Sequence, residues 1–530
     1  MKKICVSGLI AAGLVCVFWA LSCSQPSYDV VIKGGLIVDG SGEPGYQADI
    51  GIKEGRIAAI GKIKISQTQD LVDAHGKYVV PGFIDMHTHC ENISHDQLKA
   101  GLNYLTQGVT TVVTGNCGSG THRVAKYFDK MVTQGIGLNV VHLVGHGTVR
   151  ALVLKNDDRA PTDEEMAKMR TLVRQAMEEG AAGLSTGLFY APGSYAETEE
   201  IVALCEVVEE FGGIYATHIR DESTYTVGLE ASIEEAIEIG ERADVPVQIS
   251  HLKALGKPVW GKAAEVCTIV ETARERGLRI YADQYPYNAS STSLVAAVVP
   301  RWVQAGGKLR KRLKDRELIP RIKEEMKANI ERRGGADTLV ISSFPQKQEW
   351  EGKSLAEIST LLGKSEVDAA LELIFLGETS VVSFNQSDAD VEYFMQKPWV
   401  MTSSDGQITE FGKAVPHPRN YGTFPRKIRR YVLEKKIISM EHAIRAASGL
   451  PAEMLEFNDR GLLKESYAAD IVVFDPERIR DRATFAEPHQ YSEGIDFVLV
   501  NGQVVIRNGE FTVTLAGKPL SPAEPANSVE

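Results

Sequence analysis

The chain has 530 residues and a formal net charge of −12, with 43% hydrophobic and 24% charged residues. This composition is typical of a globular protein with a sizeable core, and it excludes a wholly disordered chain. The length is enough for two to four domains of about 150 residues, or for one barrel with a smaller domain. The negative charge argues against nucleic acid as a partner, because phosphate binding needs a basic face.

The chain begins with a segment that resembles a secretory signal. Lys2 and Lys3 precede an apolar run over 4–21. The run ends at Ala20-Leu21-Ser22-Cys23, which is similar to a bacterial lipoprotein cleavage box. We therefore expect a signal peptide over 1–22, lipidation of Cys23, membrane attachment through this anchor, and a place in the cell envelope, at the outer membrane or facing the periplasm. An uncleaved anchor and plain secretion are the alternatives.

Both ends of the remaining chain are rich in short predicted strands. Residues 30–32 and 36–38 are apolar and flank a Gly-Gly pair, and 50–52 and 57–60 flank a Glu-Gly pair. Near the other end, Asn501-Gly502 separates two apolar runs, which is a strong hairpin signal. We expect these ends, residues 27–80 and 445–515, to build one small β-sandwich domain together.

Between these ends, predicted strands alternate with amphipathic helices. Residues 162–179 carry apolar side chains at helical spacing, and Thr162 with Glu165 fits a capping box. The candidate strands are 79–89, 110–116, 139–145, 182–188, 214–219, 246–250, 279–283 and 399–403. Eight strands with intervening helices predict an α/β fold, a TIM-like (β/α)8 barrel over 81–444. The long interval between strands seven and eight predicts an insertion over 288–397, which is a candidate lid.

The first chemical signal is His87-Thr88-His89, at the end of the first predicted barrel strand. Alternation in a strand places residues i and i+2 on one face, so both imidazoles are expected to point the same way. The C-terminal end of a barrel strand is where active sites of this fold lie. His-x-His by itself is a weak motif, and two incidental histidines are the alternative.

Other candidate ligands follow other predicted strands. Cys117 lies in a glycine-flanked turn after the second strand, whereas His218 and His251 come at the ends of the fifth and sixth. Asp405 follows the eighth strand in Ser404-Asp405-Gly406. Imidazole, thiolate and carboxylate are the groups that bind Zn²⁺. The sequence therefore predicts a metal site at this face of the barrel, although Cys117 alone fits a small buried residue and Asp405 alone fits a turn.

These motifs resemble the amidohydrolase superfamily and, within it, the D-aminoacylase (N-acyl-D-amino-acid deacylase) family. The resemblance spans the barrel from end to end. It is carried by the stretches Pro81-Gly82-Phe83-Ile84-Asp85-Met86-His87-Thr88-His89, Gly115-Asn116-Cys117-Gly118, 145–150, 185–190, Tyr285-Pro286-Tyr287, Ser404-Asp405-Gly406 and 417–426.

The resemblance implies a role for each candidate. His87, His89, His218 and His251 would bind one or two zinc ions, with Cys117 as a thiolate that can bridge two sites. Asp405 would act as general base and then as general acid. A metal lowers the pKa of water towards about 7 and polarises an amide oxygen. Asp405 would take a proton during attack and return it to the leaving amine.

The absence of one lysine separates two kinds of relative. Many hydantoinase- and dihydroorotase-type relatives bridge two metals through a carboxylated lysine on strand four. This sequence has no lysine between Lys168 and Lys253, which leaves Cys117 as the bridging candidate. The missing lysine favours an open-chain amide over a cyclic one, and the family resemblance implies zinc-dependent hydrolysis of N-acyl-D-amino acids to a carboxylate and a free D-amino acid. A dipeptidase for C-terminal D-residues, a cyclic amidohydrolase and a non-catalytic binding lipoprotein are the alternatives.

A deacylase of this kind also has to hold a small-molecule N-acyl amino acid by its carboxylate. Arg419 and Arg426 follow Asp405, and a guanidinium suits bidentate carboxylate binding. The family resemblance points to Arg419 as the carboxylate anchor. The hydroxyl candidates are Tyr190, Tyr285, Tyr287 and Ser291, with packing at the barrel rim as the alternative for the tyrosines.

Overall fold

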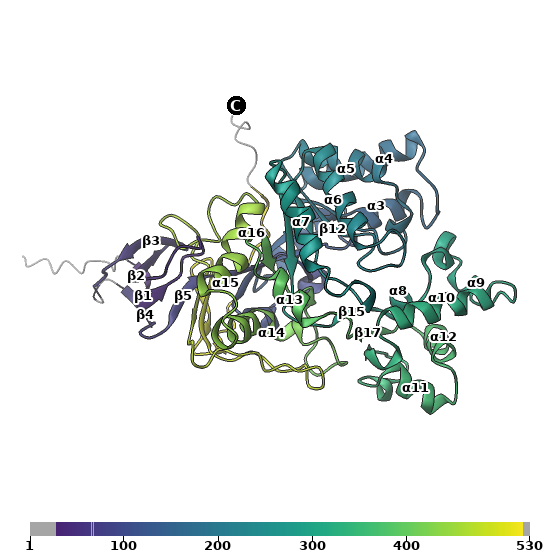
Figure 1. Cartoon of the computed structure of the whole chain (residues 1–530). Coiled ribbons are helices and arrows are strands. Elements are labelled where there is room, and N and C mark those ends of the chain that lie inside the picture. The colour runs from purple at the N-terminus through teal and green to yellow at the C-terminus, as the bar shows by residue number, and fades with distance from the viewer. Residues whose placement is uncertain (1–27, 65, 67, 523–530) are drawn as a thin grey trace, which may run out of the picture.

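The computed structural model describes residues 28–64, 66 and 68–522. The expected signal peptide and Cys23 lie outside these residues. Within the described part of the chain, no helix combines the length and the apolar character needed to cross a bilayer. Figure 1 shows three parts: a sheet built from both ends of the chain, a central barrel, and an insertion that projects from the barrel on the side away from the sheet.

The terminal sheet joins the two ends of the chain. Its order is β23-β22-β21-β20-β5-β1-β2-β3, with β4 paired to β1. Antiparallel pairing of β5 with β20 makes the junction, with Val79 opposite Val473. The strands are β1 Tyr28–Ile37, β2 Tyr46–Lys53, β3 Arg56–Gly61, β4 Thr68–Asp73, β5 Tyr78–Pro81, β20 Ile471–Phe474, β21 Ile495–Val500, β22 Gln503–Arg507 and β23 Glu510–Phe511. The expected Asn501-Gly502 hairpin is confirmed, with φ of 48° and 79° as its turn type requires.

The barrel has parallel strands in the expected chain order. They are β6 Phe83–Asp85, β8 Val109–Thr114, β9 Asn139–His142, β10 Val144–Gly145, β11 Gly183–Gly187, β12 Ile214–His218, β13 Val247–Ile249, β14 Ile280–Gln284 and β18 Val400–Thr402. One run pairs as β6-β8-β9 and the other as β10-β11-β12-β13-β14-β18. Because only Leu143 separates β9 from β10, they continue as one strand of the barrel. Parallel pairing of β7 (Thr88–His89) with β19 (Gly406–Gln407) brings the first and last positions together.

The first expected strand, 79–89, is not continuous. Its start, β5, belongs to the terminal sheet, and only β6 pairs within the barrel. Gly82 lies at the change of sheet, where a Cβ would approach Thr110 Oγ1 to 2.2 Å. Pro81 before it has no N–H for a ladder hydrogen bond. His87 therefore lies in a bend between β6 and β7 rather than inside a strand.

Helices surround the barrel and bury their apolar faces against it. The ring and its neighbours contain α1 Leu102–Leu105, α2 Val124–Gln134, α3 His146–Val153, α4 Asp163–Glu178, α5 Thr198–Glu209, α6 Leu229–Ala243, α7 Ala263–Glu275, α13 Asp388–Phe394, α14 Arg419–Arg426, a π-helix Lys427–Glu434, α15 Met440–Ala447 and α16 Gly449–Met454. The expected capping box of α4 is confirmed by reciprocal bonds between Thr162 and Glu165. Met169, Val173 and Met177 of α4 are buried in the barrel's outer core.

The insertion has a hydrophobic core of its own. It contains α8 Leu294–Val298, α9 Leu309–Arg312, α10 Ile319–Arg332, α11 Leu355–Leu362 and α12 Glu366–Leu376, around a sheet of β15 Ser290–Ser293, β17 Ser380–Ser383 and β16 Leu339–Ser343. Ile322, Met326 and Leu373 are buried in this core. Although the expected insertion ran to residue 397, α13 packs against α7 and completes the barrel's ring. The separate core thus ends before α13.

Candidate metal centre and active site

The expected ligands and base meet at one end of the barrel. His89 ends β7, and His218 ends β12. Cys117, His251 and Asp405 each lie in the turn directly after a barrel strand, β8, β13 and β18 respectively. Carboxyl ends of parallel barrel strands share one face, so residues far apart in sequence come together there.

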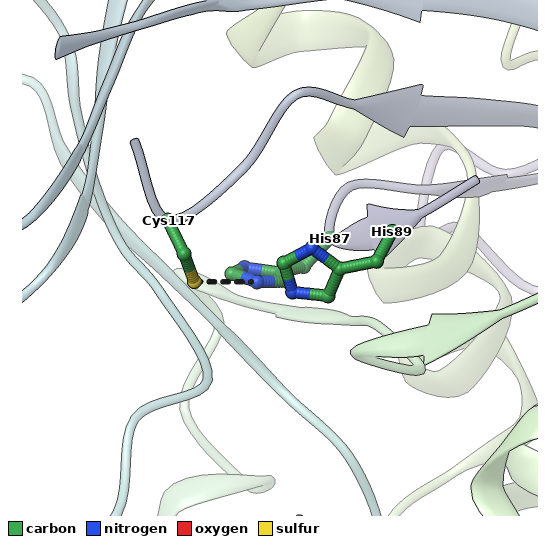
Figure 2. A group of neighbouring side chains, drawn as sticks. All are labelled: His87, His89 and Cys117. Atoms are coloured by element: carbon green, nitrogen blue, oxygen red, sulfur yellow. Dashed lines mark hydrogen bonds between the residues drawn. The ribbon is translucent and has the colours of Figure 1, made fainter. Parts of the chain in front are cut away.

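Cys117 lies between two groups of histidines. Its Sγ is 3.4 Å from His87 Nε2, 3.7 Å from His218 Nδ1 and 3.8 Å from His251 Nε2. His87, His89 and Cys117 form one group whose donor atoms lie within 4.8 Å of one another, and Cys117, His218 and His251 form a second. Figure 2 shows the first group, with both imidazoles beside the sulfur. One thiolate shared by two groups is the arrangement that a bridging ligand needs.

The turn that carries Cys117 is fixed by unusual backbone and by Ser185. Cys117 has a φ of 53°, and its neighbours Gly115 and Gly118 also have positive φ. A Cβ on Gly115 would come within 2.2 Å of the Leu143 carbonyl oxygen, so only glycine fits. The Ser185 hydroxyl donates to the Gly115 carbonyl and accepts from the Gly118 N–H at 3.0 Å. This buried serine therefore holds both sides of the turn.

Asp405 lies beside the first histidine group and forms an ion pair with Arg419. Its Oδ1 is 3.4 Å from His89 Nε2, and its Oδ2 is 2.8 Å from Arg419 Nη1. Burial alone would raise the pKa of Asp405, but the positive charges of Arg419 and His251 and the bond with His89 hold it well below its ordinary value. The side chain is therefore a carboxylate at neutral pH, able to accept a proton.

The pKa of Cys117 shifts in the direction that a metal-binding thiol needs. Burial by itself would raise it, but the charge of His87 and the hydrogen bonds of His218, His251 and His87 outweigh burial. The pKa of the thiol lies well below its ordinary value as a result. The thiolate is the form that binds metal ions.

A cavity of about 420 Å³ opens above these residues. Cys117, His89, His218, His251 and Asp405 line its floor region together with residues from the insertion. The donor set of four imidazoles and one thiolate matches the ligands that zinc takes. The ring nitrogens that face the Cys117 sulfur are Nε2 of His87, Nδ1 of His218 and Nε2 of His251. The residues present fit one or two such ions.

Comparison with known proteins agrees with this geometry. The model of the amidohydrolase family matches residues 70–300 and 353–506, and that of the urease alpha-subunit N-terminal domain matches 19–81. A D-aminoacylase of Alcaligenes xylosoxydans xylosoxydans is 36% identical over 521 residues, which is 94% of this chain and 98% of the relative. The chain belongs to the D-aminoacylase family of metal-dependent amidohydrolases.

Two further relatives and two solved structures show which substrates and metals are named for proteins similar to this chain. An N-acyl-D-aspartate deacylase and an N-acyl-D-glutamate deacylase of the same organism are each 34% identical to the chain. An N-acyl-D-glutamate deacylase from Bordetella bronchiseptica, solved with zinc and a phosphonate inhibitor, has a TM-score of 0.80 at 32% identity, over 94% of this chain and 99% of that one. A D-aminoacylase described by its binuclear metal centre has a TM-score of 0.79 at 32% identity, over 94% and 100%. The expected fold and family are confirmed. The sequence identities to the three relatives lie between 34% and 36%, so they do not decide which D-amino acid the substrate contains.

The candidate substrate residues of this D-aminoacylase family member divide into two sets. Tyr190, Tyr285, Ser291 and Arg419 line the cavity. Tyr287 is buried behind it, with the Arg426 guanidinium 4.6 Å from its ring centroid. Arg426 itself donates to the Pro286 carbonyl and pairs with Asp481 at 3.0 Å. Of the two expected tyrosines Tyr285 and Tyr287, only Tyr285 therefore lines the cavity. Of the two arginines, Arg419 lines it and Arg426 does not.

Asp283 is a site residue that sequence reasoning missed. It ends the seventh expected strand, yet no role was predicted for it. Its Oδ1 accepts from the His251 N–H at 3.0 Å and from the Ser403 hydroxyl, and its Oδ2 lies 3.6 Å from His87 Nδ1. The carboxylate therefore orients the backbone at one expected ligand and the ring of another. Its place at a strand end was the available signal.

A buried ion pair behind His251 was missed as well. Lys253 Nζ lies 2.5 Å from Glu222 Oε1 and 2.7 Å from His251 Nδ1. Burial would raise the pKa of Glu222, but Lys253, His218 and His251 hold it well below its ordinary value. Lys253 also lines the cavity. Only its position two residues after His251 could have indicated this role.

Proposed function

We propose that this protein hydrolyses the amide bond of N-acyl-D-amino acids, with zinc as its metal, to give a carboxylate and a free D-amino acid. The observation that carries the proposal is the shared thiolate of Cys117 between two histidine pairs, beside the ion pair of Asp405 and Arg419 in one cavity. Relatives that are named as deacylases of N-acyl-D-amino acids support it.

His87, His89, Cys117, His218 and His251 would hold the metal. When bound, zinc supplies an electrophile for the amide oxygen and lowers the pKa of water. The work of the chain's own residues is to position the substrate and to move protons. His87 is fully buried, whereas Cys117 is half-buried and lines the cavity.

Asp405 would move the proton. As a carboxylate it accepts a proton from the attacking water through Oδ1 or Oδ2, and the O–H bond of the water breaks as its oxygen forms a bond to the amide carbon. The protonated Asp405 then donates to the amide nitrogen while the C–N bond breaks, so that the amine leaves neutral. Its φ of 48° aims the side chain back towards His89.

Arg419 would hold the substrate carboxylate. It lines the cavity at the first residue of α14, and its guanidinium lies 4.8 Å from the ring centroid of Tyr285. Its Nε has no hydrogen-bond partner within the described residues. Tyr285, Tyr190 and Ser291 present hydroxyl groups to the same cavity. A carboxylate bound here would lie beside Asp405 and hence beside the scissile amide.

The test is turnover by the zinc-loaded protein on matched panels of N-acetyl-D- and N-acetyl-L-amino acids. We expect amine release from the D-panel at about a hundredfold higher kcat/KM or more. Asp405→Asn and Asp405→Ala should each lower kcat by about 10³-fold or more, because the proton then has no carrier. The exposed Asp129→Asn on α2 is the control and should match the wild type.

Either of two results would contradict the proposal. Equal release from both panels would remove D-selectivity. No release from either, with zinc bound, would move the activity to dipeptides with a C-terminal D-residue or to cyclic amides, which the same preparation can be given next.

A further inference from the structure

One lysine and two arginines line the cavity, and they differ in whether a carboxylate lies beside them. Lys253 pairs with Glu222 at 2.5 Å, and Arg419 pairs with Asp405 at 2.8 Å. Arg333 also lines the cavity but has no carboxylate within 4.0 Å among the described residues. It is therefore a cavity-lining cation whose partner the described chain does not supply.

Arg333 is held in place by the insertion. It follows α10 directly, and the buried Ile322, Met326 and Ile330 anchor that helix in the insertion's own core. The side chain is 2% exposed, and its Nε donates to the Ala297 carbonyl at 3.2 Å. Its Nη1 is buried and has no hydrogen-bond partner among the residues that the structure describes. A guanidinium fixed at one nitrogen and unsatisfied at another is prepared to bind an acceptor.

The acids that line the same cavity are already engaged. Glu222 binds Lys253, and Asp405 binds Arg419. Glu91 accepts a hydrogen bond from the Gly115 N–H at 3.0 Å. A buried cation without an opposite charge is unfavourable, and a carboxylate that forms paired hydrogen bonds with a guanidinium removes that cost. Since no carboxylate of the described residues pairs with Arg333, an acidic group on a molecule that enters the cavity would supply the opposite charge.

We propose that Arg333 binds a second carboxylate of the substrate, so that the preferred N-acyl-D-amino acids are dianions. This inference rests on the proposed function and makes its substrate class specific. Arg419 beside Asp405 takes the carboxylate next to the scissile amide, and Arg333 on the insertion takes the other. The second carboxylate belongs either to an acidic side chain or to the acyl group, which share the same chemistry at Arg333.

The experiment compares matched pairs of substrates that differ by one charge. N-acetyl-D-glutamate against N-acetyl-D-glutamine tests a side-chain carboxylate. N-succinyl-D-alanine against N-butanoyl-D-alanine tests a carboxylate on the acyl group. We expect kcat/KM of the zinc-loaded wild type to favour the dianion of one pair by about 10- to 100-fold, the range for a charged hydrogen-bonded pair. The pair that shows the preference identifies the source.

Variants then assign the preference to Arg333. Arg333→Met should remove most of the preference while kcat/KM for the monoanionic substrates stays within about threefold, and Arg333→Lys should retain part of it. The matched control is Arg332→Met, because Arg332 is the neighbouring residue of α10 and does not line the cavity. Thermal melting of each variant shows that the fold is kept.

Three outcomes would overturn the inference. The wild type could hydrolyse both members of each pair equally, or Arg333→Met could keep the full preference for the dianion. Loss of the preference in Arg332→Met to the same extent would assign it to the segment rather than to Arg333. Absence of hydrolysis on every compound would instead overturn the proposed function, and this inference with it.

Discussion

Single residues carry most of the chemistry of this site, and several of them are held in rare backbone conformations. Cys117, His251 and Asp405 have φ of 53°, 38° and 48°. Such conformations are unfavourable for residues other than glycine and are retained where the surrounding structure enforces them. The residue types indicated metal chemistry from the sequence, whereas these conformations explain how three turns aim their side chains at one point.

Lys427 gives a prediction at the same scale. It is 3% exposed at the start of the π-helix, and its Nζ donates to Thr402 Oγ1 at 2.8 Å. Burial lowers the pKa of this lysine from 10.5 to about 7. Between these values the unfolded chain binds one more proton than the folded chain, so the stability contributed by Lys427 rises with pH through this window.

Lys427→Met should therefore raise the free energy of unfolding at pH 6, on the order of 2–4 kcal/mol, because the buried charge is removed. The gain should shrink as the pH approaches 10. Denaturant unfolding at several pH values measures it, and the exposed Lys130→Met on α2 should change stability little at any of them. A pH-independent difference between Lys427→Met and the wild type would contradict the assignment.

At the scale of elements, the loop after β8 depends on a residue of β11. Ser185 on β11 binds both Gly115 and Gly118, and so fixes the turn of Cys117. We predict that Ser185→Ala weakens zinc binding by about tenfold or more, as loss of a group that orients a ligand does. Competition with a chelating dye measures the affinity.

The control for Ser185→Ala is Ser359→Ala in α11, a buried serine that also donates to a main-chain carbonyl but lies in the insertion. Zinc affinity should be unchanged there. If Ser185→Ala binds zinc as tightly as the wild type, the turn keeps its shape without the serine and the role assigned to it is wrong.

Two elements show where local patterns suffice and where they do not. The alternation of 79–89 predicted one strand, but the chain leaves one sheet and enters another at Gly82. Tyr285 and Tyr287 would share a face if the strand continued, but β14 ends at Gln284. Arg419 and Arg426 lie two turns apart on α14, roughly 10 Å along the helix, so only the first reaches the cavity.

At the scale of the whole molecule, the terminal sheet ties both ends of the chain to the barrel. Ile471 on β20 pairs with Pro81 of β5 on one side and Leu499 of β21 on the other, and it is fully buried. We predict that Ile471→Ala lowers the free energy of unfolding by about 3 kcal/mol, since it leaves a cavity between the two ends. Calorimetry or denaturant unfolding measures the loss.

The matched control is Val132→Ala on α2, whose side chain is 71% exposed and should change stability by about 0.5 kcal/mol or less. The kcat/KM of Ile471→Ala at 25 °C should equal that of the wild type, because the sheet lies away from the cavity. A large loss of activity without a loss of stability would show that the sheet acts on the site directly.

The insertion shows how a separate core can complete an active site. Its own hydrophobic cluster allows it to keep its shape, and it supplies Ser291 and Arg333 to the wall of the cavity. In Figure 1 it projects from the barrel on the side away from the terminal sheet. Its composition alone indicated no substrate, because the position of Arg333 above the barrel is a property of the packing.

The sequence alone determined the barrel and the order of its strands, because these follow from local periodicity. It predicted five metal ligands and a base from the residues at strand ends, with their roles implied by the family resemblance. The tertiary structure alone decided which residues behind and above them take part. Asp283, the pair of Lys253 and Glu222, and Arg333 are recognised only by what they contact. Those contacts join elements that are distant in sequence, and no local pattern records them.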